Sequence, residues 1–147
     1  MLLINNILVR HQSSRIKYKI DRLWDNFRRR CQRFKRGYAY SDVWDINVWF
    51  MRTVKTMLIH LRDHGIGIPG ELVVDGENQR ANWENVLTEM INCLDMMDED
   101  NVYESLGFYD YDQLLSIEDY KRVGAIMEEN KNRFFELFSK YFFSLWD

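Results

Sequence analysis

The feature that most constrains the fold is a 24-residue segment, Ser41 to His64, that contains neither glycine nor proline. Its apolar residues recur at spacings of three and four, the period of a helix with a buried face. Ser41 is a favoured N-cap residue and Gly65 follows directly, so we predict a helix over residues 41–64. Additional apolar side chains widen this face around the circumference, which predicts a central helix packed on more than one side.

Three other segments carry the same helical period. Residues 14–36 form one predicted helix, which Ser13 or Ser14 can cap and Gly37 can end. Its apolar stripe comprises Ile16, Ile20, Leu23, Trp24, Phe27, Cys31 and Phe34. Residues 79–97 form the next helix, and residues 116–146 form the last, opened by a capping-box pattern from Ser116 to Asp119.

We therefore predict an all-α fold, a compact bundle of about four main helices at 14–36, 41–64, 79–97 and 116–146. The long connector before residue 79 has room for one short extended segment. The acidic, tyrosine-rich stretch 98–115 is expected to be a loop.

Charge divides the chain unevenly. Residues 1–40 carry 11 basic and two acidic residues, a balance of +9, whereas residues 41–147 carry nine basic and 21 acidic residues, a balance of −12. A chain of 147 residues can bury one sizeable core, so we predict a single domain over 1–147 with a basic N-terminal arm and an acidic helical body. The opposite charges favour docking of the arm on the body. A basic arm for nucleic acid or another polyanion is the alternative.

The two cysteines, Cys31 and Cys93, do not have the spacing of a disulfide framework or a zinc knuckle. The apolar opening run lacks a basic region and a cleavage site, and it is too short to cross a bilayer. We expect a protein of a reducing compartment that is neither secreted nor anchored in a membrane.

Motifs for catalysis are weak. Gly65 to Gly70 fits the G-x-G-x-x-G pattern, but it follows a helix rather than a strand and is interpreted as a helix stop and a turn. His60 and His64 could face one metal ion, yet no third ligand is evident, and cationic residues at a helix end are expected from the dipole. We predict no metal, no cofactor and no enzymatic activity.

Two groups of residues are candidates for binding. Arginines interleaved with aromatic residues suit a nucleobase and its phosphate, because the ring offers a stacking surface and the guanidinium holds the anion. Asp45, flanked by apolar residues, is expected to pair with an arginine of the basic helix. The candidate binding residues are Arg28, Arg30, Arg33, Tyr38, Tyr40, Trp44, Asp45 and Trp49. The candidate interface residues, for a partner or a second copy, are Phe135, Phe138, Phe142 and Trp146.

The segment Arg36 to Ile46, with the long helix, His64-Gly65, Pro69, Trp83 and Met90-Ile91 after it, resembles small proteins encoded by tailed phages and prophages. In that family a Gly-Tyr/Phe-Ser-x-x-Asp-Val-Trp-Asp-like start leads into a long helix, a Gly-Tyr-Pro-like turn and a Trp-containing helix. The resemblance covers about residues 36–94, and the turn is longer here. It implies a setting, the cytoplasm of an infected bacterial host cell, and no particular activity.

Our leading hypothesis is a phage accessory protein that binds and antagonises a host component, for example in immune defence. Its partner would be a host protein or a nucleotide signal. One alternative is a virion or assembly protein that oligomerises through its aromatic C-terminal helix. A second is a nucleic-acid-binding protein that uses the basic N-terminal helix.

Overall fold

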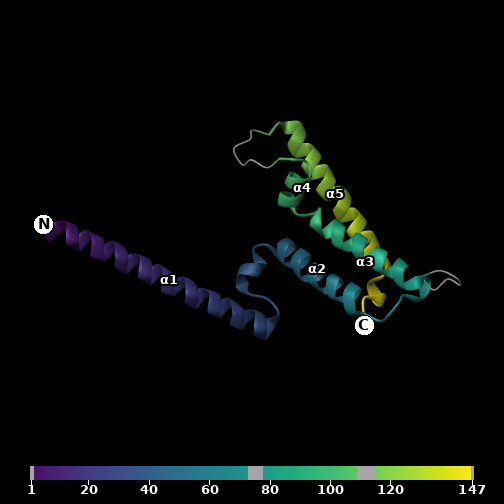
Figure 1. Cartoon of the computed structure of the whole chain (residues 1–147), viewed down its shortest axis with the longest axis horizontal. Helices are drawn as coiled ribbons and strands as arrows, with labels where there is room; N and C mark the ends of the chain where they lie inside the picture. The colour runs from purple at the N-terminus through teal and green to yellow at the C-terminus, as the bar shows by residue number, and fades with distance from the viewer. Residues whose placement is uncertain (1, 73–77, 109–114, 147) are drawn as a thin grey trace. The chain divides into compact units, whose positions relative to one another are not determined.

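The computed structural model describes residues 2–72, 78–108 and 115–146, with side chains from residue 18 onward. Every regular element in this part is helical (Figure 1), so the predicted all-α fold is confirmed. The α-helices are α1 (Leu2–Arg36), α2 (Ile46–His64), α3 (Gln79–Asp95), α4 (Glu99–Ser105) and α5 (Ile117–Lys140). Short 3₁₀ helices are η1 (Tyr40–Val43), η2 (Gly70–Leu72) and η3 (Phe142–Ser144). The extended segment predicted for the connector falls largely on residues 73–77, outside the described residues.

The chain divides into two compact units, Met1–Ile46 and Asn47–Asp147. The first holds α1 and η1, and the second holds nearly all of α2 and everything after it.

Helix α1 begins at Leu2, so the prediction that Ser13 or Ser14 caps its start is wrong. No glycine or proline occurs before Gly37, and a lone pair of serines costs a helix too little to stop it. The predicted end is confirmed. Gly37 has a φ of +79°, a conformation that favours glycine, and its N–H bonds the Arg33 carbonyl at 2.8 Å.

The predicted start of the next helix at Ser41 is also wrong, because η1 and a turn precede α2. Within η1, the Asp42 carboxylate accepts a hydrogen bond from the Ala39 N–H at 2.8 Å. The side chain of Asp42 thereby closes its own capping turn with residue 39, and the helix of residues 46–64 starts afresh after it.

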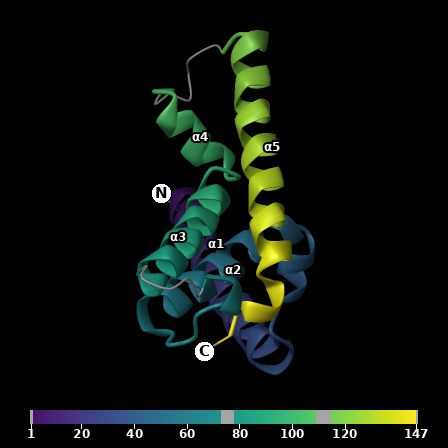
Figure 2. The ribbon, with the colours of Figure 1, turned by 90° about the vertical axis from the view of Figure 1, so that its right-hand side faces the viewer.

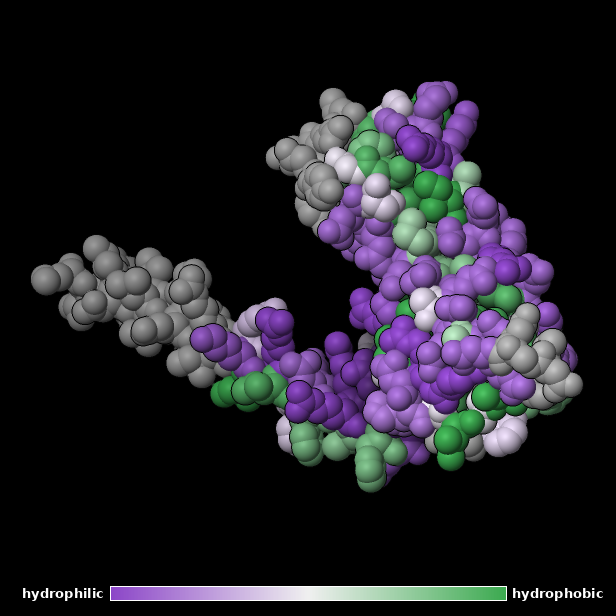
Figure 3. All heavy atoms as spheres, turned by 45° about the vertical axis from the view of Figure 1, so that its right-hand side comes forward, coloured by the Kyte–Doolittle hydropathy of each residue, from purple (hydrophilic) through white to green (hydrophobic). Residues whose placement is uncertain are grey.

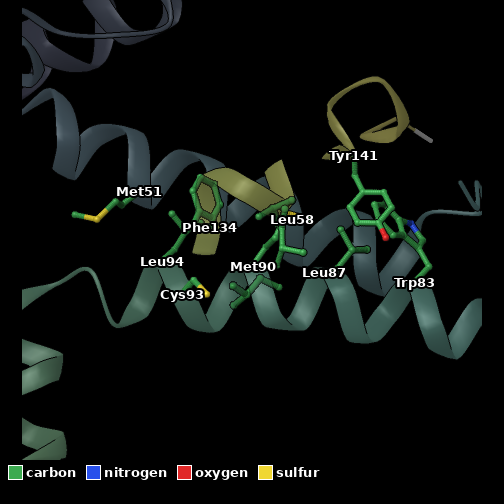
Figure 4. Packing of buried hydrophobic residues seen from close by; sticks show 11 residues of the cluster. Met51, Leu58, Trp83, Leu87, Met90, Cys93, Leu94, Phe134 and Tyr141 are labelled. Atoms are coloured by element: carbon green, nitrogen blue, oxygen red, sulfur yellow. The ribbon is translucent and has the colours of Figure 1, made fainter. Parts of the chain in front are cut away.

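In the second unit the central helix is α3, not α2 as the sequence suggested. Six side chains of α3 are buried, but only Met51 and Leu58 of α2 are, and Met57 is 66% exposed. The core joins α2, α3 and the C-terminal half of α5 (Figure 4). The rings of Trp83 and Tyr141 pack edge to face, with their centroids 5.4 Å apart. The members of the core are Met51, Leu58, Trp83, Leu87, Met90, Ile91, Cys93, Leu94, Phe134, Leu137 and Tyr141.

The acidic stretch predicted as a loop contains α4, which lies beside α5 in Figure 2. Asp98 caps this helix by accepting a hydrogen bond from the Asp100 N–H at 3.2 Å. Val102 is fully buried, so α4 packs an apolar residue although most of its sequence is acidic or polar.

Helix α5 starts as predicted, with a capping box between Ser116 and Asp119. It ends at Lys140 rather than 146, because the chain turns at Tyr141 into η3. The turn returns Trp146 to the connector after α2, where an added Cβ on Gly67 would lie 3.2 Å from the Trp146 carbonyl oxygen.

We expect Phe134→Ala to lower the free energy of unfolding by about 3–5 kcal/mol, because it opens a cavity in the fully buried core. Urea denaturation followed by circular dichroism measures this change. Phe143→Ala is the matched control, since Phe143 is 91% exposed, and its effect should stay within about 0.5 kcal/mol. Equal losses in the two variants would contradict the assigned core.

Candidate functional site

A bidentate ion pair fastens η1 to α1 within the first unit. Arg33 Nη2 lies 2.6 Å from Asp42 Oδ1, and Arg33 Nε lies 3.0 Å from Oδ2. The Ala39 N–H and the Ser41 hydroxyl also donate to this carboxylate. The Arg33 hydrogen bonds, followed by the Ala39 N–H bond, hold the pKa of Asp42 well below its usual range.

This pair corrects one prediction about the acid. The carboxylate that meets an arginine of the basic helix is that of Asp42, three residues before the predicted Asp45. Asp45 is exposed in the turn between η1 and α2, because closure of the Asp42 turn places it past the segment that contacts α1.

Two further contacts hold η1 along α1. The Tyr40 N–H donates to Gln32 Oε1 at 3.1 Å, and the Arg36 guanidinium lies over the Tyr40 ring, 5.2 Å from its centroid. Beside them lies an open groove of about 640 Å³. It is lined by Asp25, Arg28, Arg29, Gln32, Tyr40, Ser41 and Trp44.

The groove unites three of the predicted binding residues, Arg28, Tyr40 and Trp44. Arg33 does not line the groove but holds η1 in place through Asp42. Trp49 belongs to the second unit. The remaining candidates, Arg30, Tyr38 and Asp45, do not line the groove. Sequence analysis missed Asp25, Arg29, Gln32 and Ser41, although the spacing of residues 25, 28, 29 and 32 follows one helical face.

The opposite face of α1 is an apolar stripe that η1 leaves uncovered. At about 100° per residue, this stripe lies on the far side of α1 from Asp25, Arg29 and Gln32. Hydrophobic side chains are visible on the surface of the described part of α1 in Figure 3. The exposed fractions are 59% for Ile20, 68% for Leu23, 68% for Trp24, 58% for Phe27 and 93% for Phe34.

A second groove, also of about 640 Å³, lies in the second unit between α2 and the C-terminal segment. Three of the four predicted interface residues line it, namely Phe138, Phe142 and Trp146. The fourth, Phe135, instead stacks on Phe50, with ring centroids 6.0 Å apart. Self-association or partner docking through this surface stays a prediction.

The two histidines of α2 stack on each other, with ring centroids 4.6 Å apart. Over the described ranges, no three His, Cys, Asp or Glu side chains cluster in a way that could hold a metal ion. Nor does any helix in these ranges have the length and apolar character needed to cross a membrane.

No protein-family model matches the chain, and comparison with curated proteins and with solved structures finds no match.

We expect acid to release η1 from α1. The pKa of Asp42 in the folded protein lies below its usual value of about 3.9. The Arg33–Asp42 pair therefore contributes its full stabilisation above about pH 3.9, and this stabilisation is lost as the pH falls towards the folded-state pKa. Asp42→Asn should release η1 already at neutral pH. The Ala39 amide resonance in NMR spectra reports the change, and Asp45→Asn is the control that should leave it in place. A shift in Asp45→Asn as large as that in Asp42→Asn would refute the assignment.

Proposed function

We propose that this chain is a phage-encoded, non-enzymatic accessory protein that binds a host protein through the apolar stripe of α1 and thereby antagonises a host process. The large exposed side chains of this stripe are Ile20, Leu23, Trp24, Phe27 and Phe34. The resemblance of residues 36–94 to phage-encoded proteins supports the setting.

The observation that carries this proposal is the exposure of the stripe. Within the first unit, five large apolar side chains on one face of α1 are each more than half exposed. Proteins rarely leave contiguous patches of this kind bare unless they serve an interface. Transfer of each such side chain from water into a partner contributes about 1.5–3 kcal/mol.

Charge indicates which partner fits. Residues 18–36 carry eight basic and two acidic residues, a balance of +6, so pairing two copies of this helix would oppose like charges. An apolar groove rimmed by aspartate and glutamate would cover the stripe and neutralise its flanks. This is the helix-in-groove mode of recognition, with anchors spaced at three and four residues.

Nucleic acid fits the same surface less well. A phosphate backbone would satisfy the arginines but leave the apolar stripe in water, where it gains nothing. The host-protein proposal accounts for the charges and the apolar residues together.

The first test is site-specific photocrosslinking in the bacterial host. A benzophenone amino acid at position 27 should capture one acidic host protein, whereas the same group at Ile117, which is 71% exposed on α5, should not. Capture of the same set of proteins from both positions would remove the support for a specific stripe partner.

The second test uses the purified partner. Leu23→Glu and Phe27→Glu should each weaken binding by more than about 100-fold, since each places a charge in an apolar contact. Ile117→Glu, the same kind of change on another exposed helical site, should leave the affinity within about twofold. The proposal would be overturned if the chain bound anionic vesicles or DNA but no host protein.

The third test is biological. Expression of the wild-type protein should raise phage plating efficiency on a host that carries the antagonised system, and Phe27→Glu should abolish the gain while Ile117→Glu retains it. An equal gain from Phe27→Glu would show that the stripe is not the acting surface.

A further inference from the structure

We propose that the groove between η1 and α1 binds a single free nucleotide, its base on the ring of Trp44 and its phosphates on Arg28 and Arg29. Most of the groove residues on α1 lie away from the apolar stripe, although Arg28 stands one turn after Trp24 and borders it. The site does not rest on the proposed host-protein function, and the two can fail separately.

Trp44 supplies the stacking surface. Its side chain is 88% exposed at the groove, and it makes no ring contact with another described residue. An indole held bare beside basic residues is suited to a nucleobase, because base stacking on an aromatic ring tolerates any base.

Arg28 and Arg29 supply the anion site. Neither forms an ion pair within the described part of the chain, unlike Arg33, which is committed to Asp42. Their planar guanidinium groups can each donate two parallel hydrogen bonds to phosphate oxygens. Two unpaired arginines on one groove therefore favour a di- or triphosphate.

The remaining polar groups suit the sugar and the base edge. Gln32 uses its carbonyl oxygen for the Tyr40 N–H, so its amide NH₂ is left as a donor. Ser41 adds a hydroxyl, and Asp25 is an acceptor for ribose hydroxyls or an exocyclic amine.

The groove has room for a free nucleotide, and its aromatic lining favours one nucleotide over a strand. A volume of about 640 Å³ lies within the usual range of small-molecule sites, roughly 300–1,000 Å³. Strand-binding proteins instead repeat free aromatic rings along a basic track. Of the two rings that line this groove, that of Tyr40 already lies under the Arg36 guanidinium, whereas that of Trp44 is bare. The Arg33–Asp42 pair holds η1 in place before any ligand arrives, which makes Arg33 a positioning residue.

Isothermal titration calorimetry of the full chain tests the site with ATP, GTP, inorganic triphosphate and a single-stranded DNA 10-mer. At least one nucleoside triphosphate should bind more tightly than inorganic triphosphate. Trp44→Ala should weaken that binding by roughly 5- to 100-fold and Trp44→Phe should recover part of it. Arg28→Gln and Arg29→Gln should each cost about tenfold or more.

Matched controls separate this site from the rest of α1. Arg30→Gln removes a neighbouring arginine that does not line the groove, and Phe34→Ala removes an exposed ring of the stripe; both should change the affinity by less than about twofold. Circular dichroism verifies that each variant keeps its helix content. Phe27→Glu should lose the host partner but keep the nucleotide.

Several results would overturn the proposal. They are no binding of either nucleotide at millimolar concentration, inorganic triphosphate or the 10-mer binding as tightly as the nucleotides, and an unchanged affinity in Trp44→Ala. A released η1 in Arg33→Ala with undiminished nucleotide affinity would likewise show that the groove is not the site.

Discussion

The ion pair between Arg33 and Asp42 is the interaction on which the surface of the first unit depends. It anchors the turn after Gly37 so that η1 folds back along the polar side of α1. Because η1 occupies that side, the apolar side of the same helix has no cover from its own unit. One bidentate contact thus creates a polar groove on one face and leaves a bare hydrophobic stripe on the other.

The sequence predicted the helices well where the helical spacing of apolar residues and the local capping residues alone determine the helix bounds. Ser116 with Asp119 opens α5, Gly37 ends α1, and α3 lies within two residues of its predicted bounds. Prediction failed at residue 41, because Ser41 is a good N-cap but the Asp42 carboxylate has a stronger local partner in the Ala39 N–H and a distant one in Arg33. Sequence cannot show that distant partner.

A similar limit applies to the predicted centre of the fold. The apolar width of residues 41–64 suggested a helix packed on several sides, yet the buried side chains concentrate on α3. Apolar content tells which residues avoid water, but it does not tell whether their own chain or another molecule covers them. The candidate site shows the same limit, since Arg28, Tyr40 and Trp44 meet in one groove, whereas the acid that positions η1 is Asp42 and not Asp45.

Most basic residues of α1, and its apolar stripe, gain little from contacts within the first unit. Lys19 and Arg22 stand one turn apart, and like charges at this spacing destabilise a helix by a few tenths of a kcal/mol. Only the basic residues of the last turn gain from the helix dipole. The stripe likewise contributes nothing within its own unit while it remains in water. Both costs would be offset if, as we propose, a host protein covers the stripe and a nucleotide neutralises Arg28 and Arg29.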